Sequence, residues 1–269
     1  MAAAFEDLDR RMGRDPASHP SPDPQWYEVR TRHLLATDPD GAIAADVGGE
    51  LAGVALAIVR EGVWGLSLLV VDPAHQSSGI GRNLLAAACA YGRDAPAGII
   101  LSSDDPRAMR AYARAGFALW PSFDAEGPVL RRPALPCGVR PGRWPQDAGI
   151  VDAAGRAARG AGYARDVEAY LAAGAELLVD ERGGFAINRQ GSPALLAAES
   201  GAVATDLLRA CLRGAPPDAT VSVQFITHAN QWAIDVALDA GLPLCPAGPV
   251  CVRGGVGPLA PLLPSGAFL

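Results

Sequence analysis

Residues 67–85 combine an apolar run, a loop with two glycines and a second apolar-periodic segment. The run Leu68–Val71 is rich in branched residues and is followed by Asp72-Pro73, which is typical of a buried strand. In the loop, Gly79, Gly81 and small side chains let successive backbone N–H groups converge where the next helix begins. Amides at a helix N-terminus bind phosphate groups. The sequence therefore predicts a pyrophosphate site formed by Gln76, Ser77, Ser78, Gly79, Ile80, Gly81 and Arg82.

Residues 105–117 form a second patterned segment, Asp-Pro-Arg-Ala-Met-Arg-Ala-Tyr-Ala-Arg-Ala-Gly-Phe. The segment follows a predicted strand over 98–103, and Gly116 is a helix stop signal, so we expect a short helix over 106–115. Tyr112 lies one turn before that glycine. It is either a core tyrosine at helical spacing or a functional phenol.

Together the two segments resemble the coenzyme-A-binding motifs of the GNAT acetyltransferase superfamily. Gln76-x-x-Gly79-x-Gly81 is similar to the first motif. A Rossmann turn also uses Gly-x-Gly, but its fingerprint needs a third glycine where Asn83-Leu84 stand. A simple glycine-rich turn between a strand and a helix is the other alternative.

The second family motif, Asn-x-x-Ala-x-x-x-Tyr-x-x-x-Gly-Phe, is matched in register by Ala108, Tyr112, Gly116 and Phe117. Asp105 stands where the family usually has the asparagine that touches the pantetheine arm. The resemblance implies acetyl-CoA as co-substrate and direct attack on its thioester by the amine of a small molecule. The cofactor-binding residues that it implies are Leu69, Val70, Val71, the loop 76–82, Asp105, Ala108 and Tyr112.

By the same resemblance, Tyr112 is the catalytic residue that protonates the departing thiolate. A phenol with a pKa near 10 can donate to a thiolate with a pKa near 8.5. The general base stays open between Asp72, His75, Asp104, Asp105 and water. Aromatic residues that could shape an acceptor pocket, with core packing as the alternative for each, are Trp26, Tyr27, Trp64, Tyr163, Tyr170, His228 and Trp232.

The composition of the chain argues against nucleic-acid and membrane partners. The chain has 269 residues, 49% hydrophobic and 19% charged, with a formal net charge of −6, and all its 23 basic residues are arginines. A negative net charge argues against nucleic-acid binding, although it would tolerate a cationic substrate. No apolar run reaches the roughly 18 residues of a membrane span and the N-terminus lacks a signal pattern, so we expect a cytoplasmic protein without a membrane partner. The five cysteines are scattered and odd in number, which indicates neither a disulfide framework nor a metal site.

An internal repeat indicates two domains. Ala233, Ala240 and Gly241 repeat Ala108, Ala115 and Gly116 at a constant offset, and the proline-rich stretch 131–145 lies between the two copies. We expect an α/β protein of two tandem GNAT-like domains, 1–134 and 135–269, each with a mixed central sheet flanked by helices. Near residues 199–205 the second copy lacks the phosphate loop, and Ala237 replaces the phenol. The second domain is therefore expected to be non-catalytic and to support the fold or the substrate pocket.

The first copy is predicted to contain helices over 5–12 and 25–36, strands over 42–46, 51–59 and 64–71, and closing strands over 117–120 and 127–131. A strand is expected over 137–140 before the helices of the second copy, but none precedes Phe5, so either the first domain lacks it or the start lies upstream. The apolar tail 261–269 is expected to pack into a groove near the domain junction. It also resembles the ending of tandem actinobacterial acetyltransferases.

Two functions remain open at this point. One is an N-acetyltransferase acting on a small amine, as a monomer or homodimer. The other is a sensor that binds CoA or another ligand without turnover. A protein acetyltransferase is disfavoured, because a second domain would wall off the open groove that such enzymes need.

Overall fold

Two helices precede the first sheet. In the computed structural model, which describes residues 2–16 and 23–269, these are α1 (Ala2–Arg11) and α2 (Pro24–Thr37). The Asp23 carboxylate accepts the N–H groups of Gln25 and Trp26, and Pro24 occupies the first turn of α2, so both common start signals act together. The two predicted helices are confirmed, each slightly longer than expected.

The first half continues as a meander followed by alternating helices and strands. It contains β1 (Ala42–Val47), β2 (Glu50–Arg60), β3 (Val63–Val71), α3 (Ile80–Tyr91), β4 (Ala97–Leu101), α4 (Pro106–Arg114) and β5 (Ala118–Pro128), with short 3-10 turns η2 (Pro39–Gly41) and η3 (Pro73–His75). The prediction of two closing strands, 117–120 and 127–131, is wrong, because β5 is one long strand. It stays continuous since it pairs along both edges with strands of the second half.

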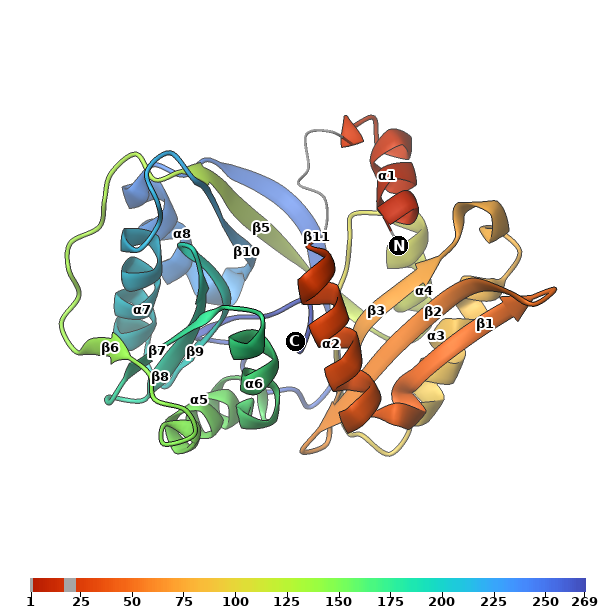
Figure 1. Cartoon of the computed structure of the whole chain (residues 1–269), viewed down its shortest axis with the longest axis horizontal. Helices are drawn as coiled ribbons and strands as arrows, with labels where there is room; N and C mark the ends of the chain where they lie inside the picture. Colours follow the sequence, from red (N-terminus) through yellow and green to blue (C-terminus); the bar gives the residue numbers. More distant parts are fainter. Residues whose placement is uncertain (1, 17–22) are drawn as a thin grey trace.

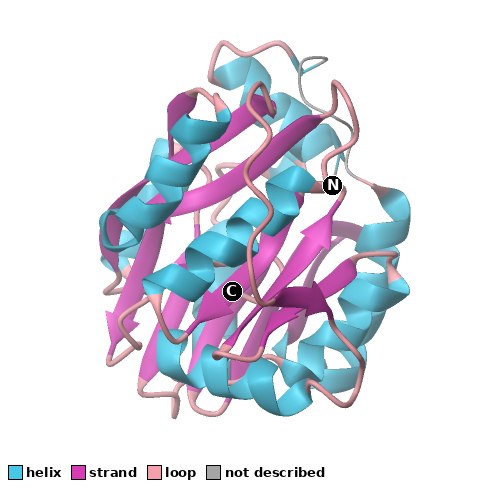
Figure 2. Cartoon of the chain, turned by 90° about the vertical axis from the view of Figure 1, so that its left-hand side faces the viewer, coloured by secondary structure: helices cyan, strands magenta, loops and turns pink. Residues whose placement is uncertain are grey.

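The second half repeats this order after an additional first strand, as the sequence predicts. Its elements are β6 (Val139–Pro141), α5 (Ala148–Arg159), α6 (Ala164–Ala172), β7 (Glu176–Asp180), β8 (Gly184–Arg189), β9 (Ser192–Ala198), α7 (Gly201–Arg213), β10 (Thr220–Thr227), η4 (His228–Asn230), α8 (Gln231–Ala240), β11 (Leu244–Gly254) and β12 (Leu262–Leu263). Helices cover the sheets in layers (Figure 2). The chain is therefore an α/β protein built from mixed sheet and flanking helices, as expected.

The two halves exchange strands. One sheet has the order β1-β2-β3-β4-β11-β5-β10, so that β11 lies between β4 and β5. Strands β5, β10 and β11 lie side by side (Figure 1). The second sheet, β12-β9-β8-β7-β6, pairs only antiparallel strands in the described chain. The boundary expected near residue 134 stays a prediction, and the seven-stranded sheet crosses it. The first half thus depends on the second to complete its hydrogen bonding.

Strands β3 and β4 diverge at the centre of the seven-stranded sheet. They pair in parallel only from Val63 with Ala97 to Leu66 with Ile100, whereas β3 continues to Val71. On its other edge β3 keeps pairing with β2, with a bulge that leaves Ser67 opposite no residue. Bulges re-aim backbone groups and are frequent beside functional sites. Beyond Leu66, one edge of β3 is therefore free of strand partners.

The C-terminal segment lies between the two halves (Figure 1), which confirms the packing predicted for the apolar tail. Phe268 is fully buried and contacts the rings of Trp26 and Tyr170 edge to face. A Cβ at Gly65 would come 1.9 Å from the Leu269 side chain, so this close approach to β3 requires glycine. The tail therefore belongs to the core between the halves.

A buried ionic cluster also joins the halves. The Arg60 guanidinium donates to Asp38 and to Asp166, both at 2.7 Å, and the His33 ring contacts Asp166 at 2.9 Å. Burial alone would raise the pKa of Asp166, but hydrogen bonds with His33 and Arg60 and the Arg60 charge lower it. The same balance, with Thr37 and the Val59 amide also donating, lowers the pKa of Asp38. Both carboxylates are thus held ionised across the interface.

Among the described helices, none is long and apolar enough to cross a membrane.

Candidate functional site

The predicted phosphate loop leads into an uncapped helix start. Gly79 precedes α3 with φ of 91°, a conformation that favours glycine, and offers no side-chain cap. The first amide of α3 with a backbone partner is that of Asn83, which donates to the Gly79 carbonyl at 3.1 Å. Across the described chain, the N–H groups of 80–82 find no acceptor. These donors at the positive end of a 12-residue helix suit an anion.

The free edge of β3 points further N–H groups toward the same space. The N–H of Asp72 donates to the Ala52 carbonyl of β2 at 2.9 Å. Because successive amides of a strand alternate between its edges, those of Leu69 and Val71 face away from β2. They therefore point to the side where β4 has diverged.

The loop and this edge border one cleft of about 640 Å³. The predicted site residues that line it are Leu69, Val70, Val71, Gln76, Ser77, Gly79, Gly81, Arg82, Asp105, Ala108 and Tyr112. Two predicted residues have side chains elsewhere. Ser78 donates its hydroxyl to the His75 carbonyl at 2.5 Å, and Ile80 packs against the hydrophobic core beneath α3. These two residues can act in the loop only through their backbone.

Five arginines also line the cleft against a single aspartate, Asp105. They are Arg11, Arg82, Arg107, Arg110 and Arg114. An excess of guanidinium groups beside uncapped helix amides fits a ligand with several phosphates. A Cβ at Gly81 would meet only the Val71 side chain at 3.5 Å, so the loop surface is open toward the cleft. The residues present therefore fit CoA.

Tyr112 lies where two cavities meet. It is 6% exposed, and its hydroxyl has no hydrogen-bond partner among the described residues. Burial raises the pKa of its phenol. A phenol that stays protonated at neutral pH and faces open space is suited to donate a proton.

Asp105 is engaged by the protein itself. One carboxylate oxygen accepts the Arg107 N–H at 2.8 Å as the N-cap of α4, and the other contacts the guanidinium groups of Arg11 and Arg107 at 3.3 and 3.1 Å. Burial opposes ionisation, but the contacts with Arg107 and Arg11 lower the pKa of Asp105. Asp105 therefore anchors α1 and α4 at the cleft.

The other candidate bases make no direct contact with Tyr112. Asp72 accepts the Ala74 N–H at 2.9 Å, which caps η3, and Asp104 pairs with Arg14 at 2.7 Å. His75 is half-buried in the η3 turn. The structure singles out no general base from this set.

A second cavity of about 500 Å³ adjoins the cleft. The cavity and the cleft share Phe5, Leu69, Ser103 and Tyr112. The cavity also receives residues from both halves of the chain, namely Trp26, Tyr27, Arg30, Tyr170, Arg189, Gln224, Phe225 and Ser265. It is therefore a chamber that opens onto the cleft at Tyr112, and we call it the acceptor pocket.

Three of the predicted aromatic residues, Trp26, Tyr27 and Tyr170, line the acceptor pocket. The other four predicted aromatic residues do not line the pocket. Trp64 is fully buried and donates to the Ala88 carbonyl at 2.9 Å, and the fully buried Tyr163 donates to the Leu269 carbonyl at 2.5 Å. His228 contacts the Trp120 ring at 5.5 Å between centroids, and Trp232 donates to Asn230 at 3.1 Å.

One wall of the acceptor pocket is conformationally strained. Phe225 has φ of 55°, in the left-handed region that a bulky side chain rarely adopts. The Asp124 carboxylate accepts the Phe225 N–H at 2.7 Å and holds this backbone at an irregularity between Val223 and Ile226. Strain of this kind persists where its surroundings fix it, often at binding sites. Here it turns Gln224 and Phe225 toward the pocket.

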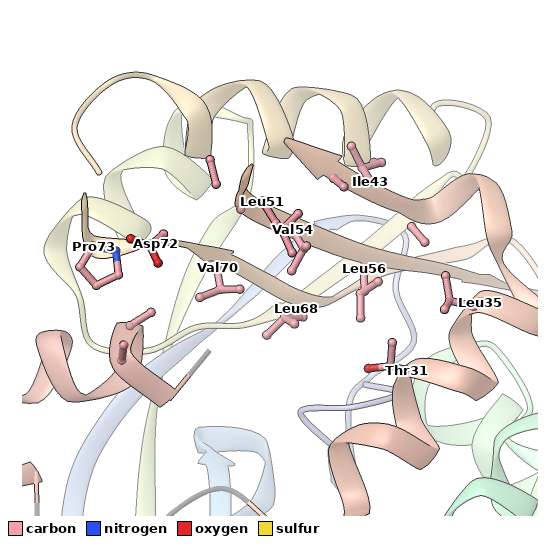
Figure 3. A pocket seen from close by; sticks show the side chains of 16 residues that line it. Thr31, Leu35, Ile43, Leu51, Val54, Leu56, Leu68, Val70, Asp72 and Pro73 are labelled. Carbon is pink, nitrogen blue, oxygen red and sulfur yellow. The ribbon is translucent and has the colours of Figure 1, made fainter. Parts of the chain in front are cut away.

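A third hollow, of about 410 Å³, lies on the face of β1–β3 opposite to α3 (Figure 3). Leu56, Leu68 and Val70 point into it from the sheet, and Thr31 and Leu35 border it from α2. Its lining is almost wholly apolar and brings together no set of catalytic groups. It extends beside the acceptor pocket, with which it shares Leu68.

The second half lacks the glycine loop that borders the cleft in the first half. Only Glu199 and Ser200 connect β9 to α7, and the Ser200 hydroxyl accepts the Val203 N–H at 3.4 Å, so the helix start is capped internally. Ala237, at the position of the phenol, is fully buried. Within residues 2–16 and 23–269, no group of three His, Cys, Asp or Glu residues is arranged to hold a metal ion.

Several lining residues escaped the sequence analysis. The stripe Arg107, Arg110 and Arg114 on α4 has the three- and four-residue spacing of one helical face and could have been found from sequence. Arg30, Arg189 and Phe225 meet only through tertiary structure and carry no local signal.

Comparisons with known proteins agree with this geometry. Residues 3–117 match the model of the acetyltransferase (GNAT) family. A putative acetyltransferase from Pyrococcus horikoshii is similar over 87% of this chain and 81% of its own, at 22% identity and a TM-score of 0.71. A GCN5-related N-acetyltransferase from Sphaerobacter thermophilus is similar over 95% and 91%, at 16% identity and a TM-score of 0.57. A tandem GNAT protein from the clavulanic acid biosynthesis pathway is similar over 84% and 87%, at 17% identity and a TM-score of 0.50.

At these identities the solved structures establish the shared fold. The search of curated proteins found no match.

Proposed function

Because residues 3–117 of this GNAT-fold chain match the model of the acetyltransferase (GNAT) family, we propose that the protein is an N-acetyltransferase. It transfers the acetyl group of acetyl-CoA to the amine of a small molecule. The observation that carries the proposal is the junction of the cleft and the acceptor pocket at Tyr112 and Leu69. Two substrates bound on either side would meet at these residues.

In this proposal the cleft holds the co-substrate along its length. The amides of 80–82 and the arginines of α4 bind the phosphates, and the amides of Leu69 and Val71 bind the pantetheine arm and the thioester carbonyl. Acetyl-CoA supplies the activated acyl group. The Leu69 amide, fixed in the sheet, stabilises the negative charge that develops on the carbonyl oxygen.

Proton transfer is the second task of the site. Tyr112 donates a proton to the sulfur of the departing thiolate, because it is neutral, buried and without a competing acceptor among the described residues. The carboxylates of Asp72, Asp104 and Asp105 are engaged in caps and ion pairs, and His75 lines neither the cleft nor the acceptor pocket. We therefore assign removal of the amine proton to water.

The second half contributes to this function without binding CoA itself. It completes the sheet through β11 and supplies Tyr170, Arg189, Gln224 and Phe225 to the acceptor pocket. The pocket is walled by both halves, which supports a small acceptor. One acetyl-CoA per chain is therefore expected.

Release of CoA thiol in the presence of an amine panel tests the proposal. We expect amine-dependent release by the wild-type protein. Tight binding of acetyl-CoA without amine-dependent release would instead favour a CoA-binding sensor.

A further inference from the structure

The charged residues that line the acceptor pocket are all positive. Its charged lining residues are Arg30 and Arg189, and none of its described lining residues is Asp or Glu. A pocket for a polycation would present carboxylates to it. This pocket presents guanidinium groups.

Arg30 is a buried cation with neutral partners. It is 6% exposed, and it donates to the Ser67 hydroxyl at 2.7 Å and to the carbonyls of Ser67 and Gly266, the latter at 3.2 Å. By contrast, the buried Arg60 pairs with two aspartates. Hydroxyl and carbonyl groups satisfy hydrogen bonds but leave the net charge of Arg30 uncompensated. A buried charge without a counter-ion is unfavourable, so an anion entering the pocket would be stabilised there.

Arg189 is already compensated. It donates to Asp23 at 3.0 Å and lies over the Trp26 ring at 5.2 Å. The fully buried Arg159 donates to the main-chain oxygens of Phe268 and Leu269, and it lies in the core without lining the pocket. Arg30 is therefore the cation that is both uncompensated and open to the pocket.

The place of Arg30 fits a group on the acceptor near its amine. Arg30 contacts Ser67, the bulged residue of β3, and Leu69 lies two residues further along that strand. A strand rises about 3.3 Å per residue, so the two positions are about 7 Å apart. An anion at Arg30 and an amine beside Leu69 are then separated by a few bonds.

Aromatic residues also line the pocket, among serine, glutamine and aliphatic side chains. The rings of Trp26, Tyr27, Tyr170 and Phe225 line it together with Phe5. Such walls favour an apolar or aromatic body.

We propose that the acceptor is a small amine that also carries a carboxylate close to the amine, such as an apolar or aromatic amino acid, and that Arg30 binds this carboxylate. The inference rests on the proposed function. The inference adds the chemical class of the acceptor to the proposed function.

Matched pairs of amines that differ only in the carboxylate test the preference. The pairs are phenylalanine with phenethylamine, tryptophan with tryptamine, and leucine with 3-methylbutylamine. Release of CoA thiol is expected with a kcat/KM at least tenfold higher for the carboxylate member of at least one pair. Equal or higher kcat/KM for the decarboxylated members would overturn the inference and leave the proposed function standing.

A binding measurement distinguishes failure of the inferred carboxylate preference from failure of the proposed activity. Calorimetry on the wild-type protein compares N-acetylphenylalanine with N-acetylphenethylamine. Tenfold tighter binding of the carboxylate compound supports the inference even where no CoA is released, in which case the proposed function alone fails. Equal binding, or binding of neither compound, counts against it.

Variants on α2 test whether Arg30 binds the carboxylate or only stabilises the fold through its contacts with Ser67 and Gly266. Arg30→Gln is expected to lower kcat/KM for the carboxylate members at least tenfold more than for their neutral partners. Arg30→Lys, which keeps the charge, should retain part of the preference. Arg32→Gln is the matched control, because Arg32 is exposed on the same helix and pairs with Glu28.

An equal loss for both members of each pair in Arg30→Gln would assign Arg30 to packing and overturn the proposal. Should that variant fail to fold, the wild-type binding comparison and Arg30→Lys still decide.

Discussion

Gly81→Asp is the sharpest perturbation of the cofactor cleft. A Cβ at this position meets only Val71 at ordinary contact distance, 3.5 Å, so the backbone should accept a substitution. A carboxylate in the first turn of α3 should even stabilise the helix by about 0.3–1 kcal/mol. Any loss of binding would therefore come from the ligand and not from unfolding.

The expected loss follows from Coulomb's law. A carboxylate about 5 Å from one phosphate charge is repelled by about 3 kcal/mol at an effective dielectric constant of 20. That energy corresponds to about a hundredfold weaker binding. The pyrophosphate carries more than one charge, so a hundredfold is the lower bound.

Calorimetric titration with acetyl-CoA measures this loss. Gly81→Asn is the matched control, since it has nearly the same shape without the charge, and it should lose much less affinity. Thermal unfolding checks that all three proteins are folded. Unchanged affinity in folded Gly81→Asp would refute the phosphate site.

The remaining predictions concern the acid, the second half and the ionic cluster. Tyr112→Phe should lower turnover by about 10²–10⁴ with little change in acetyl-CoA affinity, as measured by steady-state kinetics and calorimetry; wild-type turnover would make Tyr112 a packing residue. Residues 1–134 alone should not fold, because β11 is missing between β4 and β5, and a cooperative thermal transition of that fragment would contradict this. Asp166→Asn should destabilise the full chain by about 3–5 kcal/mol in chemical denaturation, since it leaves Arg60 with Asp38 alone. Because the pKa values of Asp38 and Asp166 are lowered in the folded state, their stabilisation is present above the unfolded value near 4 and is lost as the pH falls below it. The unfolding free energy of wild type should drop on acidification below about pH 4 more steeply than that of Asp166→Asn.

Local patterns made much of the cleft predictable. The loop 76–82 and the helix of Tyr112 are each encoded within a few residues, through glycine positions and helical spacing. Eleven of the predicted cofactor positions line the cleft for this reason. Ser78 and Ile80 differ because the side chains of a turn and of a first helical turn alternate between the ligand side and the core.

The strand exchange could not be read from the sequence. Strand β5 lies far from β10 and β11 in the sequence, and nothing in a single strand specifies which neighbour it pairs with. The predicted break in β5 fell at residues 121–126, which begin with Pro121 and include three polar residues. Strand pairing with β10 and β11 keeps this stretch extended despite its composition.

The acceptor pocket was only partly predictable for a similar reason. Aromatic content pointed to Trp26 and Tyr27, but Arg30 meets Ser67, 37 residues further along the chain, and Gly266, 236 residues further along. Phe225 reaches the pocket through a strained backbone that no propensity predicts. Such juxtapositions exist only after the two halves have packed together.

Direct transfer between the two cavities is the central claim, and isotope-labelled acetyl-CoA tests it most directly. Intact-protein mass spectrometry should detect no acetylated enzyme when labelled acetyl-CoA is added alone. Addition of a carboxylate-bearing amine should then yield labelled N-acetyl product and free CoA in equal amounts. A stable acetyl-enzyme, or CoA release without labelled product, would contradict the account.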